Sequence, residues 1–273
     1  MSEGNRIAAH YSGSGMANRV LSALTGEGMD IDALSWDRLT SFDQFHTRGL
    51  PATRDQAALA APEPGEKVID IGCGVGGPAR YLAAEFDCEV TGIDLTPDYI
   101  DVANMLTERC GLFDRARFER ANALDLPFGD GLFDIGWSQN VSMNVAEKTE
   151  FYAEIARVLR PGGRFVTSDV VVGLGGEPAW PLPWAREPSI SYVATEDEMR
   201  TAMESAGFCI VEWRDTTEEA VNIFQNPNQQ ARRGKLGVSL IAGADFPERS
   251  RNLAQGMADG AFTSVLALTV KPV

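Results

Sequence analysis

The segment over residues 68–77 constrains the fold more than any other part of the chain. Its sequence is VIDIGCGVGG, in which four strand-forming positions run directly into a glycine-rich turn. Apolar residues at Ala79, Leu82 and Phe86 follow with helical spacing, so a helix is expected over 77–86. Such a turn presents backbone N–H groups and the positive end of a helix at the carboxyl edge of a sheet. The segment therefore predicts an α/β fold with a ligand site at that edge.

The same alternation of strand and helix continues along the chain. We expect strands at 89–93, 117–119, 133–137 and 164–172, with helices at 97–110 and 145–159. An Arg-Pro-Gly-Gly run at 160–163 breaks the second of these helices. Strands separated by helices of this length are typical of a parallel sheet with helices on both faces.

The pattern changes after residue 172. A loop rich in Gly, Pro and Trp covers 173–188, and a helix over 195–206 opens with a capping box from Thr195 to Glu198. A strand at 208–213, a helical excursion at 216–260 and a strand at 262–270 complete the chain. We expect a doubly wound, seven-stranded Rossmann-like sheet with the last strand antiparallel. It carries a helical N-terminal cap and a helical insertion between strands six and seven.

Charge and composition exclude several partners. The chain has 24 Lys+Arg against 39 Asp+Glu, a net charge of −15, and one short basic cluster at 232–235 does not reverse that field, so no nucleic-acid partner is expected. No apolar run approaches the roughly 20 residues of a membrane helix, so no membrane partner is expected either. Two histidines and four scattered cysteines lack metal-ligand spacing. We expect a reduced, cytoplasmic protein without a metal or a secretory leader.

The glycine turn has two interpretations. Gly72, Gly74 and Gly77 fit the G-x-G-x-x-G pattern of dinucleotide sites, so an NAD-dependent oxidoreductase is one candidate. However, Asp70 lies two residues before the first glycine, where its carboxylate would repel a pyrophosphate and attract a cationic amino-acid ligand.

Two further positions are candidate ligand contacts. Asp94 closes the second strand, where a carboxylate can accept both hydroxyls of a ribose, in NAD or in an adenosyl ligand alike. Asn122, in the ANALDLPF segment at 121–128, can offer an amide to an adenine edge, and Leu124 can form an apolar wall beside it. A loop Asn is also a common turn former.

As an ordered set, these motifs resemble those of class I S-adenosylmethionine-dependent methyltransferases. The set comprises the D-x-G-x-G sequence at 70–74, Asp94, ANALDLPF, FDIGWSQ at 133–139 and RVLRPGGRF at 157–165. Within that superfamily the chain is similar to the sarcosine/dimethylglycine N-methyltransferases and the ubiquinone/menaquinone C-methyltransferases. From the order of the elements we expect one domain over 1–273, with a helical cap or lid at 1–60, a cofactor-binding core at 61–172, and substrate-side loops, helices and strands six and seven at 173–273.

The resemblance also implies roles for individual residues. Asp70 and the turn would hold the methionine moiety of S-adenosylmethionine, Asp94 the ribose, and Leu95 would pack on the adenine. Ala123 would offer its backbone N–H to that ring, and many relatives have Asp where this chain has Asn122. The implied cofactor-binding residues are Asp70, Gly72, Cys73, Gly74, Gly76, Asp94, Leu95, Asn122, Ala123, Leu124, Gln139 and Asn140, the last two lining the methyl-transfer channel.

The segment at 41–49 is the candidate lid. Phe42 and Phe45 are spaced to anchor it in the core, while Gln44 and His46 are the candidate catalytic residues beside the acceptor. The alternative is a hydrogen-bonded structural cluster. Trp184, in the later loop, either forms an aromatic wall for a cationic amine or packs the lid.

We predict methyl transfer from S-adenosylmethionine to a small-molecule acceptor, with an amine favoured and O-, C- or S-methylation open. The released product is S-adenosylhomocysteine. Besides the NAD-dependent oxidoreductase, a non-catalytic S-adenosylmethionine-binding module is an alternative. Whether the chain forms a homodimer is left open by the sequence.

Overall fold

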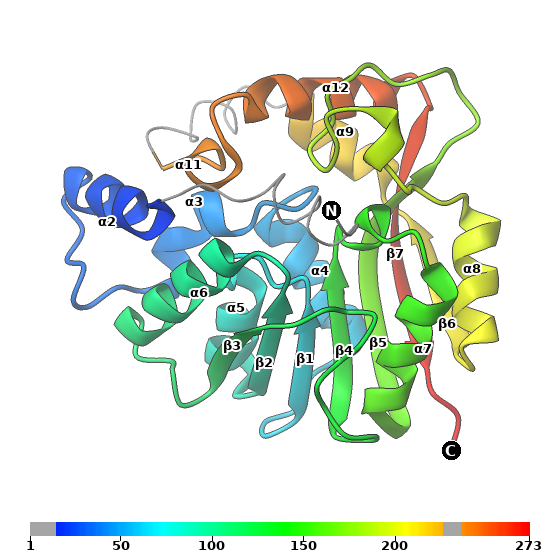
Figure 1. The fold of residues 1–273 in the computed structure, drawn as a ribbon, viewed down its shortest axis with the longest axis horizontal. Coiled ribbons are helices and arrows are strands. Elements are labelled where there is room, and N and C mark those ends of the chain that lie inside the picture. Colours follow the sequence, from blue (N-terminus) through cyan, green and yellow to red (C-terminus); the bar gives the residue numbers. More distant parts are fainter. Residues whose placement is uncertain (1–14, 226–235) are drawn as a thin grey trace.

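A computed structural model describes residues 15–225 and 236–273, so the basic cluster at 232–235 lies outside the described residues. A seven-stranded sheet runs through the molecule, with its strands in the order β3-β2-β1-β4-β5-β7-β6 (Figure 1). The strands are β1 (Lys67–Ile71), β2 (Glu89–Asp94), β3 (Ala116–Arg120), β4 (Phe133–Gln139), β5 (Leu159–Val172), β6 (Cys209–Asp215) and β7 (Phe262–Val270).

Strand directions confirm the expected topology. β1 pairs in parallel with both β2 and β4, and the parallel order extends to β3 and β5. β7 lies between β5 and β6 and runs antiparallel to both. The sheet is therefore the seven-stranded Rossmann-like sheet with an antiparallel last strand that the sequence predicts.

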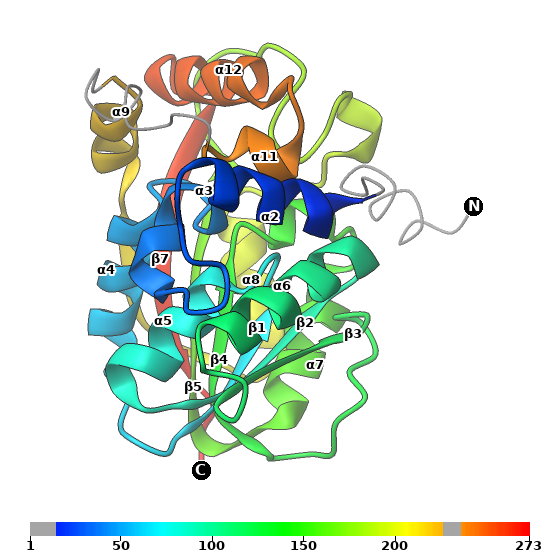
Figure 2. The same cartoon turned by 90° about the vertical axis from the view of Figure 1, so that its left-hand side faces the viewer.

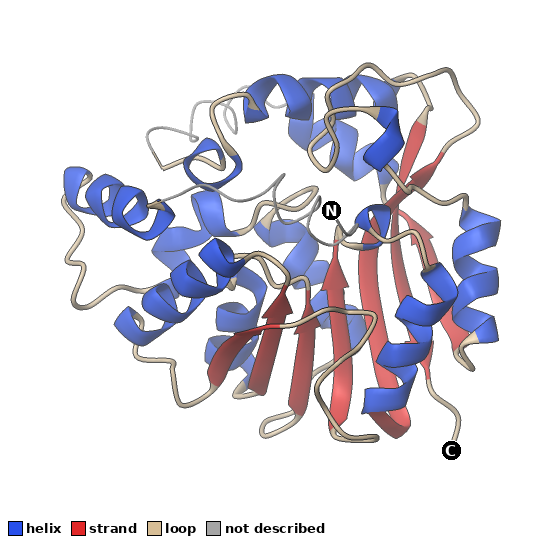
Figure 3. Cartoon of the chain, in the orientation of Figure 1, coloured by secondary structure: helices blue, strands red, loops and turns tan. Residues whose placement is uncertain are grey.

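Helices cover both faces of the sheet (Figure 3). Val68 packs into one apolar cluster with residues of α5, whereas its neighbour Ile69 packs into another with residues of α7 and α8. Successive side chains of a strand point to opposite faces, so a strand buried on both sides is apolar throughout. The helices of these two layers are α4 (Leu50–Ala60), α5 (Gly77–Phe86), α6 (Pro97–Arg109), α7 (Lys148–Val158) and α8 (Glu196–Ser205).

A further layer of short helices lies beyond the carboxyl ends of the parallel strands (Figures 1 and 2). It combines elements from the two ends of the chain. These are α2 (Met16–Gly26), α3 (Thr40–Asp43), α9 (Thr217–Gln225), α11 (Ser239–Ala242) and α12 (Phe246–Ala258). The 3-10 helix η1 (Trp36–Leu39) packs against α5 instead, with the ring of Trp36 edge-on to Tyr81. Two single 3-10 turns complete the described helices, η2 (Ser142–Asn144) and η3 (Pro188–Ile190).

Two boundaries differ from the sequence prediction. Strand β5 begins at Leu159, before the Pro-Gly-Gly run rather than after it, because Gly162 and Gly163 exchange backbone hydrogen bonds with Lys271. Helix α7 begins at Lys148 rather than at Val145, which is extended after η2. Tertiary pairing thus outweighs the local preference of glycine and proline for a loop.

No helix of the described residues is long and apolar enough to cross a membrane. Within the same residues, no group of three or more His, Cys, Asp or Glu side chains could hold a metal ion.

Candidate active site

The glycine turn is fastened to the neighbouring strand by its own backbone. The N–H groups of Gly72 and Cys73 both donate to the carbonyl of Ile93, at 2.8 and 2.9 Å. The N–H of Gly74 donates to Oδ2 of Asp94 at 3.0 Å. Three donors that a pyrophosphate would need are therefore engaged within the protein, which argues against the dinucleotide interpretation.

Asp94 joins the turn to the start of α6. Its Oδ1 accepts a hydrogen bond from the N–H of Thr96 at 2.8 Å, while its Oδ2 accepts from Gly74. Burial raises the pKa of this carboxyl, and those backbone donors act in the opposite direction. Each carboxylate oxygen has two lone pairs, so capacity for a ribose hydroxyl is left.

Asp70 contributes a buried carboxyl to the site. Its side chain is 2% exposed, and its Oδ2 has no hydrogen-bond partner among the described residues. Burial, with a smaller contribution from the charge of Asp94, raises the pKa of the Asp70 carboxyl to about 8. A buried carboxyl without a partner is costly unless a cation or donor comes to it, so this position suits a cationic ligand group.

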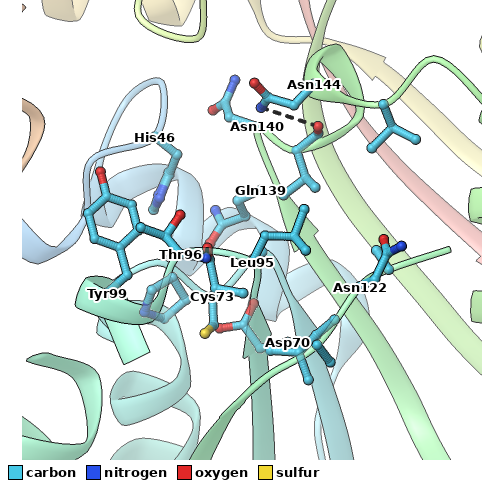
Figure 4. A pocket seen from close by; sticks show the side chains of 18 of the residues that line it. His46, Asp70, Cys73, Leu95, Thr96, Tyr99, Asn122, Gln139, Asn140 and Asn144 are labelled. Carbon is cyan, nitrogen blue, oxygen red and sulfur yellow. Dashed lines mark hydrogen bonds between the residues drawn. The ribbon is translucent and has the colours of Figure 1, made fainter. Parts of the chain in front are cut away.

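These residues border a cavity of about 360 Å³ at the carboxyl edge of the sheet. Figure 4 shows Asp70 and Cys73 low in this cavity, with His46 and Asn140 on its opposite, upper side. The cavity brings together Asp70, Gly72, Cys73, Asp94, Leu95, Asn122, Ala123, Leu124, Gln139, Asn140 and His46 from the predicted set. We call it the cofactor cavity.

Three predicted residues do not line the cofactor cavity. The ring of Phe45 covers Gly74, so that a Cβ added there would lie 2.7 Å from Phe45 Cε1. Gly76 is the left-handed N-cap of α5, against the ring of Phe118. Gln44 lies in the wall of a second cavity instead.

Of two further lining residues, Asn122 also has a structural role and Cys73 is chemically unreactive. Asn122 accepts a hydrogen bond at its Oδ1 from the N–H of Leu124, at 3.1 Å, which is the turn-forming role of a loop Asn. Burial, together with the charges of Asp94 and Asp70, raises the pKa of the Cys73 thiol, so it is not a reactive thiolate.

Residues 41–49 form a roof over the glycine turn, and we call them the roof segment. Asp43 forms a fully buried ion pair with Arg80 of α5, at 3.0 Å between Oδ2 and the guanidinium. The ring of Phe45 packs edge-on against Tyr99, with 5.7 Å between the centroids. The N–H of Thr47 donates to Oδ1 of Asn140 at 2.8 Å, which joins the roof to the end of β4.

His46 lies in a hydrogen-bonded cluster within the roof. Its Nε2 lies 3.1 Å from the carbonyl oxygen of Gly49 and 3.1 Å from the Thr53 hydroxyl, which donates to Oε1 of Gln44 at 2.6 Å. Because a carbonyl only accepts, Nε2 carries the ring proton and Nδ1 keeps a lone pair. Burial lowers the pKa of His46 to about 4, so the ring is neutral at pH 7.

A second cavity of about 390 Å³ adjoins the first. Phe45, His46 and Asn140 line both cavities, so these three residues stand at their junction. We call this second space the acceptor cavity. Trp184 borders it but holds its own indole N–H against Ser191 Oγ at 2.9 Å.

Several lining residues were not singled out from the sequence. These are Asp43, Thr96, Tyr99, Val141, Asn144 and Glu147, which border the cofactor cavity. Thr96 lies two residues after Asp94, which ends β2, so its place after a strand end could have identified it from the sequence. The others are brought in by tertiary packing, and no local pattern marks them.

Comparison with known proteins points to the same class of enzyme that the sequence motifs resemble. A family model described as a methyltransferase domain matches residues 69–167. The O-methyltransferase cnsE of Penicillium expansum is 28% identical over 225 residues, which cover 81% of this chain and 81% of that protein. The structure of a geranyl diphosphate methyltransferase in complex with S-adenosylmethionine matches with a TM-score of 0.66 at 25% identity, over 81% of this chain and 84% of that one.

The chain is a class I S-adenosylmethionine-dependent methyltransferase. Its cofactor is S-adenosylmethionine, and it methylates a small molecule. A third relative, phosphoethanolamine N-methyltransferase 3 of Arabidopsis thaliana, is 32% identical over 136 residues, which cover 50% of this methyltransferase and 27% of the plant protein. Relatives thus include both O- and N-methyltransferases, so membership of the family does not determine the acceptor atom.

Proposed function

We propose that this methyltransferase methylates a hydroxyl oxygen of its small-molecule acceptor. The observation that carries the proposal is the set of polar groups where the two cavities meet. His46 offers the lone pair of Nδ1, and Asn140 offers an amide N–H₂ beside it, since its Oδ1 is taken by Thr47. A hydroxyl can accept a hydrogen bond from such an amide while donating its single proton to an imidazole.

The residues of the cofactor cavity fit S-adenosylmethionine. We assign the unpartnered Asp70 carboxylate to the ammonium of its methionine part, and Asp94 to the ribose hydroxyls. Leu95 and Leu124 provide apolar walls for the adenine, with Asn122 and Ala123 beside them. When bound, the cofactor supplies a methyl group on a positively charged sulfur, and S-adenosylhomocysteine is left.

His46 is assigned the role of accepting the hydroxyl proton at Nδ1. A base whose pKa is about 4 is too weak to ionise a free alcohol or phenol beforehand. The proton becomes far more acidic as the oxygen gains its new bond to the methyl carbon, and a neutral imidazole is then basic enough. The hydrogen bond from Nε2 to Gly49 fixes the ring so that Nδ1 is the free nitrogen.

The amine acceptor favoured by the sequence is less well matched to this junction. A protonated amine brings only donors, and the described residues that line the acceptor cavity contain no carboxylate to receive them. The name of the Penicillium relative, an O-methyltransferase, points the same way.

A matched acceptor screen tests the proposal. Phenols, alcohols and amines with the same carbon skeleton are incubated with S-adenosylmethionine, and release of S-adenosylhomocysteine is measured. We expect turnover with hydroxyl acceptors and at least tenfold less with amines. Turnover confined to amines would refute the oxygen assignment, and tight cofactor binding without turnover of any class would favour the non-catalytic alternative.

An isosteric variant sharpens the same test. Asn140→Asp keeps the acceptor for Thr47 and replaces the free amide donor by a carboxylate oxygen. The backbone of Asn140 is left-handed, at a φ of 55°, which Asp tolerates nearly as well as Asn. We expect hydroxyl turnover to fall by about tenfold, the scale of one lost hydrogen bond, with cofactor affinity nearly unchanged. Unchanged hydroxyl turnover would remove Asn140 from the proposal.

A further inference from the structure

We infer that the acceptor is an uncharged, hydrocarbon-rich molecule whose apolar body fills the acceptor cavity while its hydroxyl reaches His46. The hydroxyl clause rests on the proposed function, whereas the apolar and uncharged clauses rest on the walls of the cavity alone. These walls come from the roof segment, the start of α4, the residues after β4, the loop before η3 and the described insertion helices α9, α11 and α12. Their apolar members include Phe45, Met143, Trp184, Ile223, Phe224 and Leu253.

Part of the apolar lining belongs to a cluster separate from the polar groups of the junction, although the ring of Phe45 stands at the junction itself. Met143, Trp184 and Leu253 belong to one apolar cluster that also packs Phe224 under the insertion helices. Gln44, His46 and Asn140 cluster around Thr53 and Thr47 instead. An occupant therefore needs its polar, reacting end at the junction and an apolar remainder toward Trp184 and Leu253.

The charge of the walls disfavours ions. Among the described residues that line the cavity, Arg48 is the one that carries a full charge, and it pairs with Asp55. A cationic acceptor would meet no opposite charge there, and an anionic one would have to compete with Asp55 for the guanidinium.

The experiment measures binding separately from turnover. A series of 4-n-alkylphenols, from ethyl to hexyl, is titrated by calorimetry into the full chain saturated with S-adenosylhomocysteine. Each added methylene that is buried should tighten binding about threefold to fourfold, until the cavity is full. Alkylammonium and alkylcarboxylate ions of equal length should bind at least tenfold more weakly than the phenol. Equal affinity across the chain lengths, or ions that bind as tightly as phenols, would overturn the inference.

The design separates this inference from the proposed function. Length-dependent binding of alkylphenols without any turnover would refute the hydroxyl assignment and support the apolar cavity. Turnover of phenols without dependence on chain length would support the hydroxyl assignment and refute the apolar cavity.

A charge placed in the wall gives a matched pair of variants. Ile223 lines the cavity from α9, while its neighbour Asn222 is exposed and does not line it. Ile223→Asp should weaken hexylphenol binding at least tenfold and favour hexylammonium, whereas Asn222→Asp, with a comparable charge change, should alter neither more than twofold. Equal behaviour of the two variants would overturn the inference.

A second variant keeps the test valid if Ile223→Asp does not fold. Leu253→Ala removes volume from the wall formed by α12, so the tightest-binding alkylphenol should become longer by one or two methylenes. An optimum at the parent length would contradict an occupant that reaches Leu253. Thermal unfolding of each variant serves as the folding control.

Discussion

The two cavities of this methyltransferase share a wall but are built in opposite ways. The cofactor cavity is formed mainly by residues 70–147, where successive strand ends bring Asp70, Asp94 and Asn140 to one edge of the sheet. The described residues of the acceptor cavity come from five segments far apart in sequence, 40–51, 140–143, 183–184, 223–224 and 238–253. The first carries buried carboxyls, and the second is mostly apolar. The cofactor cavity is thus built around polar groups at neighbouring strand ends. The acceptor cavity is built from mostly apolar residues of distant segments.

The largest expected effect comes from Gly74→Val, which should break the cofactor half of this comparison. Gly74 has a φ of 53°, and a Cβ there would lie 2.7 Å from the ring of Phe45. Both the roof and the turn must then shift, so we expect cofactor affinity to fall by more than about 10³-fold, given the rigidity of a packed site. Calorimetric titration with S-adenosylmethionine is the measurement.

Gly111→Val is the matched control for that variant. Gly111 is also left-handed, at a φ of 67°, but nothing lies within 4 Å of its added Cβ. It bears the same kind of backbone strain without the clash, so it should lower the unfolding temperature and leave cofactor affinity within twofold. Equal losses in both variants would attribute the effect to strain alone.

A smaller effect is expected at the junction of the two cavities. His46→Ala should lower turnover by about 10²-fold, the lower end of the range for a general base, with cofactor affinity unchanged. In the parent enzyme the histidine-dependent fall of activity should occur near pH 4, because burial lowers the pKa of His46 to about 4. Steady-state kinetics across pH is the measurement.

Two other outcomes at His46 are informative. A KM that rises more than kcat falls would make His46 a positioning residue for the acceptor. If both constants match those of the parent, the hydrogen-bonded cluster with Thr53 and Gln44 is purely structural.

The smallest of the three effects is expected for Asp70→Asn. Loss of one charged hydrogen bond should weaken S-adenosylmethionine binding by about 1.5 kcal/mol, or roughly tenfold, at pH 8. In the parent protein the pKa of Asp70 is about 8, so binding of a cation below that pH must release a proton. Parent affinity should therefore rise with pH toward about 8, where the ammonium of the ligand itself begins to lose its proton, and the variant should lack this rise.

The pH dependence of stability is an independent test of the raised pKa of Asp70. The folded protein retains a proton on Asp70 that the unfolded chain loses above the ordinary aspartate pKa of 3.8. This raised pKa favours folding below pH 3.8, and that contribution is lost as the pH rises toward 8. Asp70→Asn should consequently raise the unfolding temperature at pH 8 relative to the parent, and a lower one would contradict the raised pKa.

The sequence predicts the cofactor half far better than the acceptor half. Asp70 and Asp94 follow from local rules, because strand ends and glycine turns fix where their side chains lie. The seven-stranded Rossmann-like sheet with an antiparallel last strand is expected from the sequence and is confirmed. The capping box from Thr195 to Glu198 is observed as well.

The acceptor half could not be derived from local patterns. Its apolar residues, such as Ile223 and Leu253, have the spacing of ordinary helix faces, and nothing in the sequence distinguishes a cavity wall from a core. The Arg-Pro-Gly-Gly run at 160–163 was expected to separate the helix from the strand that starts at residue 164, yet pairing with Lys271 draws it into β5. The ion pair of Asp43 with Arg80 joins residues 37 positions apart, a distance at which no periodicity applies.

That ion pair sets how the enzyme exchanges its ligands. Lifting the roof segment would leave the guanidinium of Arg80 buried without its counter-charge, at a cost of about 3 kcal/mol or more. Fewer than about one molecule in a hundred would then have a raised roof at any moment. Exchange of ligands is therefore expected to occur mostly with this ion pair intact.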